Sequence, residues 1–269
     1  MLATDLDGTL LGSKRTVSRA DWDALVALGE RGIVRVIATG RSLYSARKVL
    51  TSDLPIDYLV YSSGAGAITW PGEEPVFGHS MAADLAQVVD AELQRLGCDF
   101  MAQYPAPDTH KFSYVGCSGA RNLDFDHRIE LYQEHATARR GALGHAVSQF
   151  VVVSRQMGGV ALFEELKQRL AQCNVVRTTS PLDDHSVWIE VFPANVSKAA
   201  GCAAIARKHM IEPAQTMGIG NDFNDLDMLD WVGSAFVVAN GPAEMRGRYE
   251  VVASNDAGGL SQAIARWRP

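Results

Sequence analysis

The chain has 269 residues, of which 47% are apolar and 21% are charged, an ordinary composition for a globular protein with room for two domains. Twenty-five basic and 31 acidic residues give a net charge of −6, so neither nucleic acid nor an anionic membrane is an expected partner. No apolar run approaches the roughly 18 residues of a membrane span, and Asp5 comes too early for a signal peptide, so we expect a cytoplasmic protein.

Two aspartates near the start of the chain stand in the run Thr4-Asp-Leu-Asp-Gly-Thr-Leu-Leu11. Side chains two apart on a strand point to the same side, and the turn that Gly8 permits would hold Asp5 and Asp7 at the strand's tip. Two adjacent anions repel unless a cation or a shared proton relieves them. The pair is therefore a candidate Mg²⁺ site in which one carboxylate can attack an electrophile and the other can carry a proton. A solvated Asp-rich turn is the alternative interpretation.

Helices and strands are predicted to alternate after this run. Ser18 and Asp21 form a capping-box-like start, and helical apolar spacing follows as far as Gly32. The expected elements are a helix at 18–32, a strand at 33–38, a helix at 42–50 and a strand at 57–61. This order favours an α/β fold with a doubly wound, Rossmann-like parallel sheet, which binds ligands at the carboxyl ends of its strands.

The strand at 33–38 ends in Thr39-Gly40-Arg41. Taken alone, Thr39 and Gly40 are typical of a turn. Their place after a parallel strand nevertheless predicts that they lie at the same edge of the sheet as Asp5 and Asp7. Arg41 either serves a phosphate site there or pairs with an acidic neighbour.

A second module is predicted in the middle of the chain. The turn-rich stretch at 62–75 is a plausible exit from the first domain. Beyond it, a helix–strand–strand pattern occurs twice, with strands near 99–103, 111–115, 174–178 and 186–191. We therefore expect one domain at 1–81 and 187–269, interrupted by an inserted α/β domain at 82–186.

The last part of the chain supplies further polar residues. Lys198 stands near a helix start, where it is normally solvated and slightly unfavourable against the helix dipole. The acidic run Gly218-Ile-Gly-Asn-Asp-Phe-Asn-Asp225 follows a short apolar segment, and Asn240 could support that loop. The cysteines show no metal-type spacing and are expected to be reduced; they are Cys98, Cys117, Cys173 and Cys202.

Taken in order, the segments around Asp5, Thr39, Lys198 and Asp225 resemble the four motifs of the haloacid dehalogenase superfamily of phosphohydrolases. The inserted module resembles the α/β cap of its Cof-type and sucrose-phosphatase-like branch. The resemblance implies that Asp5 is a nucleophile that forms an aspartyl-phosphate and that Asp7 is the general acid and base. It implies that Thr39, Gly40 and Lys198 bind the phosphoryl group. It also implies a Mg²⁺ site made by Asp5, Asp7, Asn221 and Asp225.

One motif departs from the family pattern. Asn221 stands where the family has an aspartate that ligates the metal directly. An amide oxygen can coordinate Mg²⁺ but adds no negative charge. Asp222, the next residue, could compensate through a bridging water, and Asp225 keeps its expected place.

The resemblance implies a Mg²⁺-dependent phosphatase acting on a small phosphorylated metabolite, with a sugar phosphate favoured. A phosphomutase or phosphotransferase would use the same four motifs and the same intermediate. A weakly catalytic binding protein, with a metal site impaired by Asn221, is a further alternative. The sequence does not indicate the substrate or the oligomeric state.

Overall fold

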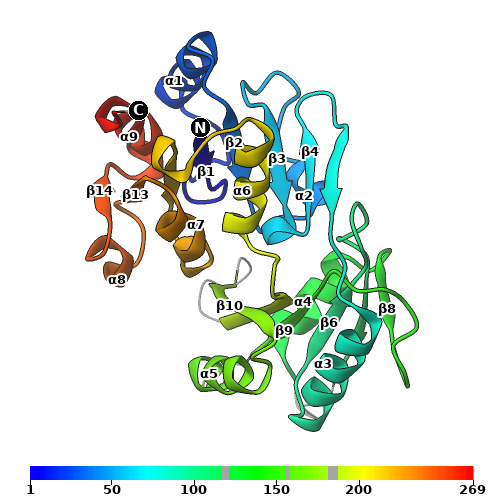
Figure 1. The fold of residues 1–269 in the computed structure, drawn as a ribbon. Coiled ribbons are helices and arrows are strands. Elements are labelled where there is room, and N and C mark those ends of the chain that lie inside the picture. Colours follow the sequence, from blue (N-terminus) through cyan, green and yellow to red (C-terminus); the bar gives the residue numbers. More distant parts are fainter. Residues whose placement is uncertain (117–120, 155–157, 181–186, 269) are drawn as a thin grey trace. The chain divides into compact units, whose positions relative to one another are not determined.

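The structure is a computed structural model that describes residues 1–116, 121–154, 158–180 and 187–268. The chain divides into two compact units. The first, here called the core unit, combines Met1–Phe77 with Ser197–Pro269, and the second, the inserted unit, is Gly78–Val196. Figure 1 shows the inserted unit in green and the two halves of the core unit in blue to cyan and in yellow to red.

An eight-stranded sheet forms the centre of the core unit. Its order is β14 (Glu250–Val252), β13 (Ser234–Val238), β12 (Met217–Gly220), β1 (Leu2–Thr4), β2 (Arg35–Ala38), β3 (Tyr58–Tyr61), β4 (Gly66–Thr69) and β5 (Pro75–Gly78). The strands from β14 to β3 pair in parallel, and β4 joins β3 antiparallel. The predicted parallel α/β core is confirmed, and β1 lies in its middle.

Helices cover the core sheet and connect its strands. They are α1 (Arg19–Glu30), α2 (Leu43–Ala46), α6 (Lys198–Lys208), α7 (Leu226–Trp231), α8 (Ala243–Arg246) and α9 (Gly259–Arg266). On one face, Cys202 and Ile205 of α6 and Met228 of α7 pack against alternate residues of β1, β2 and β3. Figure 1 shows α6 beside β2 and β3. Elsewhere α1 packs against α9, and the Asp21 carboxylate of α1 accepts a hydrogen bond from the backbone N–H of Ser261 in α9.

The inserted unit is built on a six-stranded sheet. Its order is β10 (Cys173–Thr179), β11 (Val187–Pro193), β9 (Gln149–Val153), β6 (Phe100–Gln103), β7 (Phe112–Val115) and β8 (Ala136–Ala138). Helices α3 (Ala83–Arg95) and α5 (Gly159–Arg169) pack with one set of alternate strand residues, including Phe100, Phe150 and Ile189. Helix α4 (Leu123–Leu131) packs with the other set through Phe125. The helices therefore lie on both faces of this sheet.

Four details differ from the sequence prediction. The helix expected at 42–50 is a single turn, α2, and the stretch at 62–75 contributes β4 and the start of β5 to the core sheet. The units divide at 77/78 and 196/197 instead of 81/82 and 186/187. The second boundary lies later because β11 pairs with β9 and β10 in the inserted unit. Elements α4, β8 and β9 had no counterpart in the predicted double helix–strand–strand pattern.

Two observations concern membranes and thiols. Within the described ranges, none of the helices is both long enough and apolar enough to cross a bilayer. Cys98, Cys173 and Cys202 are free thiols, and Cys117 lies outside the described residues. Burial raises the pKa of Cys202 to about 12, so this side chain is a packed thiol rather than a nucleophile at neutral pH.

Candidate active site

The parallel sheet brings the predicted site residues to one edge of the core unit. Asp5 follows β1, Thr39 follows β2 and Asn221 follows β12. Because these strands are neighbours and parallel, their carboxyl ends meet at the same edge. The backbone N–H of Asp5 still donates to the Ile219 carbonyl at 3.0 Å, so Asp5 is held as firmly as a strand residue.

Lys198 lies between two carboxylates at this edge. Its Nζ donates to Asp5 Oδ1 at 2.7 Å and to Asp225 Oδ1 at 2.6 Å. The Lys198 side chain is 1% exposed, and those of Asp5 and Asp225 are 7% and 0% exposed. These contacts offset the unfavourable position of an ammonium in the first turn of a helix. Lys198, Asp5 and Asp225 are therefore brought together as the motif order predicts.

Two neighbours fix the start of α6, which carries Lys198. The Ser197 side chain caps the helix by accepting a hydrogen bond from the backbone N–H of Ala200 at 3.1 Å. Asp227 Oδ2 accepts a hydrogen bond from the backbone N–H of Ala199 at 3.0 Å. Both contacts satisfy N–H groups that a helix leaves unpaired at its start. They hold the Lys198 backbone in place, and no pattern in the sequence marks Asp227 for this role.

Asp225 also orders the loop after β12. Its Oδ2 accepts hydrogen bonds from the backbone N–H groups of Asn221 at 2.8 Å and Asp222 at 3.0 Å, while Oδ1 accepts from Lys198. Asp222 Oδ1 accepts from the backbone N–H of Phe223 at 2.8 Å. Asp225 is thus a structural centre of the site as well as a charge in it.

Burial sets the charge state of this cluster. Desolvation, together with the negative charge of Asp225, raises the pKa of Asp5 to about 7, against the opposing effect of Lys198. Burial alone would lower the pKa of the Lys198 ammonium, but Asp225 and Asp5 raise it well above its usual range. Lys198 is therefore a permanent cation. With Asp5 and Asp225 both ionised, the cluster carries an excess negative charge that an added cation would relieve.

This pKa gives a prediction about stability in metal-free buffer. Folded Asp5 holds its proton up to about pH 7, whereas the unfolded chain releases it near pH 3.8. Between these values the folded state binds more protons, so the free energy of unfolding decreases as pH rises. Asp5→Asn lacks this titrating carboxyl group. The urea concentration at its unfolding midpoint, minus that of wild type, should therefore increase from pH 4 to pH 7 and stay constant above pH 7. Urea titrations across this range, in EDTA, measure the difference, and a constant difference would contradict the prediction.

Asp7 pairs with Arg41. Arg41 Nε donates to Asp7 Oδ2 at 2.7 Å, and Nη2 donates to Oδ1 at 2.6 Å. Arg41 Nη1 also donates to the Ser45 carbonyl at 3.2 Å, which ties the guanidinium to α2. Of the two roles considered for Arg41, pairing with an acidic neighbour is the one observed. Both Asp7 oxygens are engaged in this geometry.

Thr39 and Gly40 lie in the loop after β2. Thr39 is 1% exposed, and its Oγ1 accepts a hydrogen bond from the backbone N–H of Arg41 at 3.1 Å. Gly40 is exposed; a Cβ built there would lie 3.6 Å from both Asn224 Nδ2 and Ser63 Oγ. A Cβ at this position would therefore be in ordinary contact with two hydrogen-bonding side chains, without a clash.

Asn221 faces the turn that follows the two aspartates. Its Oδ1 accepts a hydrogen bond from Thr9 Oγ1 at 3.1 Å. Gly8 has φ +74°, and a Cβ built on it would lie 2.5 Å from Asn221 Nδ2, so the close approach depends on a glycine. Asn240 Nδ2 donates to the Gly8 carbonyl at 2.8 Å, so Asn240 supports this turn.

The acidic groups of the site do not gather into a ready-made metal site. Across the described part of the chain, no three His, Cys, Asp or Glu side chains lie close enough together to hold a metal. The reason in this site is visible: Asp7 pairs with Arg41, and the first position of the loop after β12 is an amide. A cation here would need amide or backbone oxygens among its ligands.

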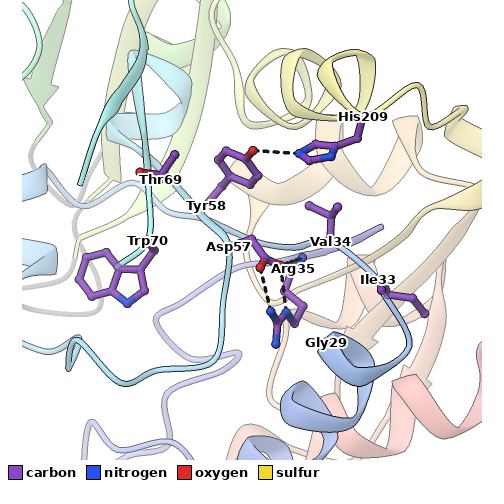
Figure 2. Close-up of a pocket in the computed structure, with 10 residues that line it drawn as sticks. Gly29, Ile33, Val34, Arg35, Asp57, Tyr58, Thr69, Trp70 and His209 are labelled. Atoms are coloured by element: carbon purple, nitrogen blue, oxygen red, sulfur yellow. Dashed lines mark hydrogen bonds and ion pairs between the residues drawn. The ribbon is translucent and has the colours of Figure 1, made fainter. Parts of the chain in front are cut away.

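A cavity of about 350 Å³ lies elsewhere in the core unit. Figure 2 shows its lining, including the Arg35–Asp57 ion pair and the Tyr58–His209 hydrogen bond of 2.9 Å. Arg35 and Tyr58 begin β2 and β3, so the cavity lies at the amino ends of these strands. Asp5 and Thr39 follow the carboxyl ends, so this cavity is not the candidate active site.

Comparisons with known proteins agree with the fold and the motifs. A family model described as haloacid dehalogenase-like hydrolase matches residues 2–264. A putative phosphatase of Streptococcus pyogenes serotype M6 is 24% identical over 99% of this chain and 97% of its own. A chloroplastic protein of Arabidopsis thaliana named endoribonuclease YBEY is 25% identical over 98% of this chain, which spans only 45% of that protein.

Solved structures extend this likeness to the whole architecture. A haloacid dehalogenase subclass IIB sugar phosphatase has a TM-score of 0.73 with this chain at 18% identity, covering 98% of this chain and 97% of its own. The match therefore includes the inserted unit as well as the core. The chain belongs to the haloacid dehalogenase-like hydrolases.

Proposed function

We propose that this protein is a Mg²⁺-dependent phosphatase that hydrolyses a small phosphorylated metabolite through a phosphoryl-Asp5 intermediate. The observation that carries the proposal is the buried contact between Asp5 Oδ1 and Lys198 Nζ at 2.7 Å. A carboxylate held at a strand end beside a permanent cation is suited to accept a phosphoryl group, whose charge that cation can neutralise.

The reaction has two steps. In the first, a carboxylate oxygen of Asp5 bonds to phosphorus, the bond from phosphorus to the leaving oxygen breaks, and Asp7 gives that oxygen a proton. In the second, Asp7 takes a proton from water, whose oxygen bonds to phosphorus as the bond to Asp5 breaks. Both oxygens of Asp7 contact Arg41. Each oxygen keeps a second lone pair, at which Asp7 can exchange a proton while it stays paired with Arg41.

Three residues are proposed to bind the phosphoryl oxygens. Lys198 supplies a full positive charge, the Thr39 hydroxyl supplies a hydrogen bond, and the exposed backbone of Gly40 leaves room for an oxygen. Burial of Thr39 and Lys198 at 1% exposure strengthens both interactions, because little water competes for them. The transition state gains most, since its charge spreads over three oxygens.

The residues at this edge fit a hard divalent cation. The atoms at this edge that could coordinate a cation are all oxygens. The cluster of Asp5, Asp225 and Lys198 also has one negative charge in excess when Asp5 is ionised. We propose that Asp5, the Asp7 backbone carbonyl, Asn221 and Asp225 hold Mg²⁺, with Asp225 or Asp222 acting through water. When bound, the ion would neutralise charge on the phosphoryl group.

Replacing Asn221 by aspartate should tighten Mg²⁺ binding. A carboxylate adds a negative charge that the amide lacks, and affinity for hard cations rises with ligand charge. We expect the dissociation constant for Mg²⁺ to fall about tenfold by isothermal titration. Gln168→Glu, which makes the same charge change on an exposed residue of α5, is the matched control. If the two variants bind Mg²⁺ alike, Asn221 is not a ligand.

The substrate class is proposed from the relatives' names and from the fold. One structural neighbour is named a sugar phosphatase and one curated relative an HMP-PP phosphatase, both enzymes of small phosphorylated compounds. We therefore propose a small phosphorylated metabolite, with sugar phosphates tested first. Transfer to a second hydroxyl instead of water would use the same residues and would appear as a phosphorylated product.

Release of inorganic phosphate tests the proposal. A panel of sugar phosphates and one aryl phosphate would be incubated with the protein in Mg²⁺ and, separately, in EDTA. Release that requires Mg²⁺ supports the metal-dependent phosphatase, and the best substrate begins to define the leaving group. Loss of substrate without phosphate release would identify a phosphotransferase. Release that is equal in Mg²⁺ and EDTA would contradict the metal requirement.

A further inference from the structure

Three consecutive residues after β3 have left-handed backbone angles. The φ values are +49° for Ser62, +50° for Ser63 and +101° for Gly64. Such angles are uncommon for residues other than glycine and are maintained only where surrounding contacts compensate for the strain. Ser62 and Ser63 are 2% and 3% exposed, and they form the short 3₁₀ helix Ser62–Gly64. This buried turn plays no part in the proposed chemistry.

The first half of the turn holds the loop after β2. The backbone N–H of Ser63 donates to the Thr39 carbonyl at 2.9 Å, and that of Ser62 donates to the Arg41 carbonyl at 2.7 Å. Both donors are directed by the left-handed angles of the turn. The loop that carries the Thr39 hydroxyl is therefore fixed from β3.

The second half of the turn contacts the start of α6. A Cβ built on Gly64 would overlap the carbonyl oxygen of Ser197 and lie 2.7 Å from its carbonyl carbon. Ser197 is the residue directly before Lys198. The atoms in contact belong to the backbone, so rotation of a side chain cannot relieve the overlap. Gly64 therefore sets how closely Lys198 approaches the loop after β2.

We propose that the turn Ser62–Gly64 is a positioning element that fixes the spacing between the Thr39 hydroxyl and the Lys198 ammonium. It contacts the loop that carries Thr39 and the residue before Lys198, and it is not itself proposed to contact the substrate. The proposal rests on the proposed function, in which these two groups bind the same phosphoryl group. A change in the turn should then weaken phosphoryl binding as well as turnover.

Gly64→Ala and Gly32→Ala form a matched pair that tests the contact. Both glycines belong to the core unit and have positive φ, but a Cβ on Gly32 meets nothing within 4 Å. We expect kcat/KM of Gly64→Ala to fall about a hundredfold, the usual scale for a displacement of about 1 Å. Part of this fall should come from a rise in KM. The inhibition constant of inorganic phosphate should rise as well. A variant that only unfolds more readily would lose kcat and keep KM, as expected for Gly32→Ala.

Ser63→Gly and Ser63→Val test the backbone angle in variants that keep Gly64. Both remove the hydroxyl, but glycine accepts a φ of +50° whereas a β-branched residue strongly disfavours it. We expect kcat/KM of Ser63→Val to be at least about tenfold below that of Ser63→Gly, with a higher KM. Equal values for the two Ser63 variants, or a KM for Gly64→Ala equal to that of Gly32→Ala, would overturn the proposal. An inactive wild type would instead contradict the proposed function.

Discussion

Asp5→Asn should abolish phosphate release while the protein stays folded. Asparagine fills the same space and can still accept a hydrogen bond from Lys198, but its amide cannot attack phosphorus. We expect kcat to fall by at least about a thousandfold, the scale observed when a nucleophile is removed. Phosphate release under saturating substrate and Mg²⁺ measures the loss, and circular dichroism checks the fold.

Asp23→Asn is a suitable control for this variant. Asp23 lies on α1, its side chain is 55% exposed, and it forms an ion pair with Arg19 across one helical turn. Exposed pairs of this kind contribute little to stability, so this variant should keep wild-type activity. If Asp5→Asn retained most of its activity beside this control, Asp5 could not be the nucleophile.

Lys198→Met should reduce both activity and stability. Methionine resembles lysine in length but removes the ammonium that separates the Asp5 and Asp225 carboxylates. Breaking a buried ion pair by removing one partner typically costs about 3–5 kcal/mol, because the remaining charge is buried without compensation. We expect a lower urea midpoint and, since the phosphoryl group loses its cation, kcat/KM lower by at least about a hundredfold.

Lys208→Met serves as the control for the same chemical change on the same helix. Lys208 is exposed in the last turn of α6, where its positive charge interacts favourably with the negative end of the helix dipole. Its loss should cost less than about 1 kcal/mol and leave kcat/KM unchanged. Equal effects of the two substitutions would contradict the central position of Lys198 in the site.

The core of the site could be predicted from sequence because its geometry follows from local rules. A strand followed by Asp5 and another followed by Thr39 must bring both residues to one edge once the strands are parallel neighbours. Gly8 marks the turn after Asp5, and it has the positive φ that a glycine permits. Lys198 was predicted only through the motif order, since a lysine at a helix start carries no signal by itself.

Other parts depended on contacts between distant segments. The Asp7–Arg41 pair joins residues that are 34 positions apart, and the local sequence around either residue does not predict this contact. The left-handed angles at Ser62 and Ser63 could not be predicted, because serine does not favour them and only the surrounding contacts maintain them. The predicted boundary at 186/187 placed β11 in the core, although its strand was part of the predicted helix–strand–strand pattern; its hydrogen bonds are to β9 and β10.

Direct detection of the intermediate is the measurement that tests the central claim. The protein would be mixed with its best substrate and Mg²⁺, quenched in acid within a turnover, digested and analysed by mass spectrometry. We predict that the peptide containing Asp5 gains the mass of one phosphoryl group and that the same peptide of Asp5→Asn does not. A phosphoryl group on another residue, or rapid turnover with no phosphorylated peptide at any quench time, would contradict the account.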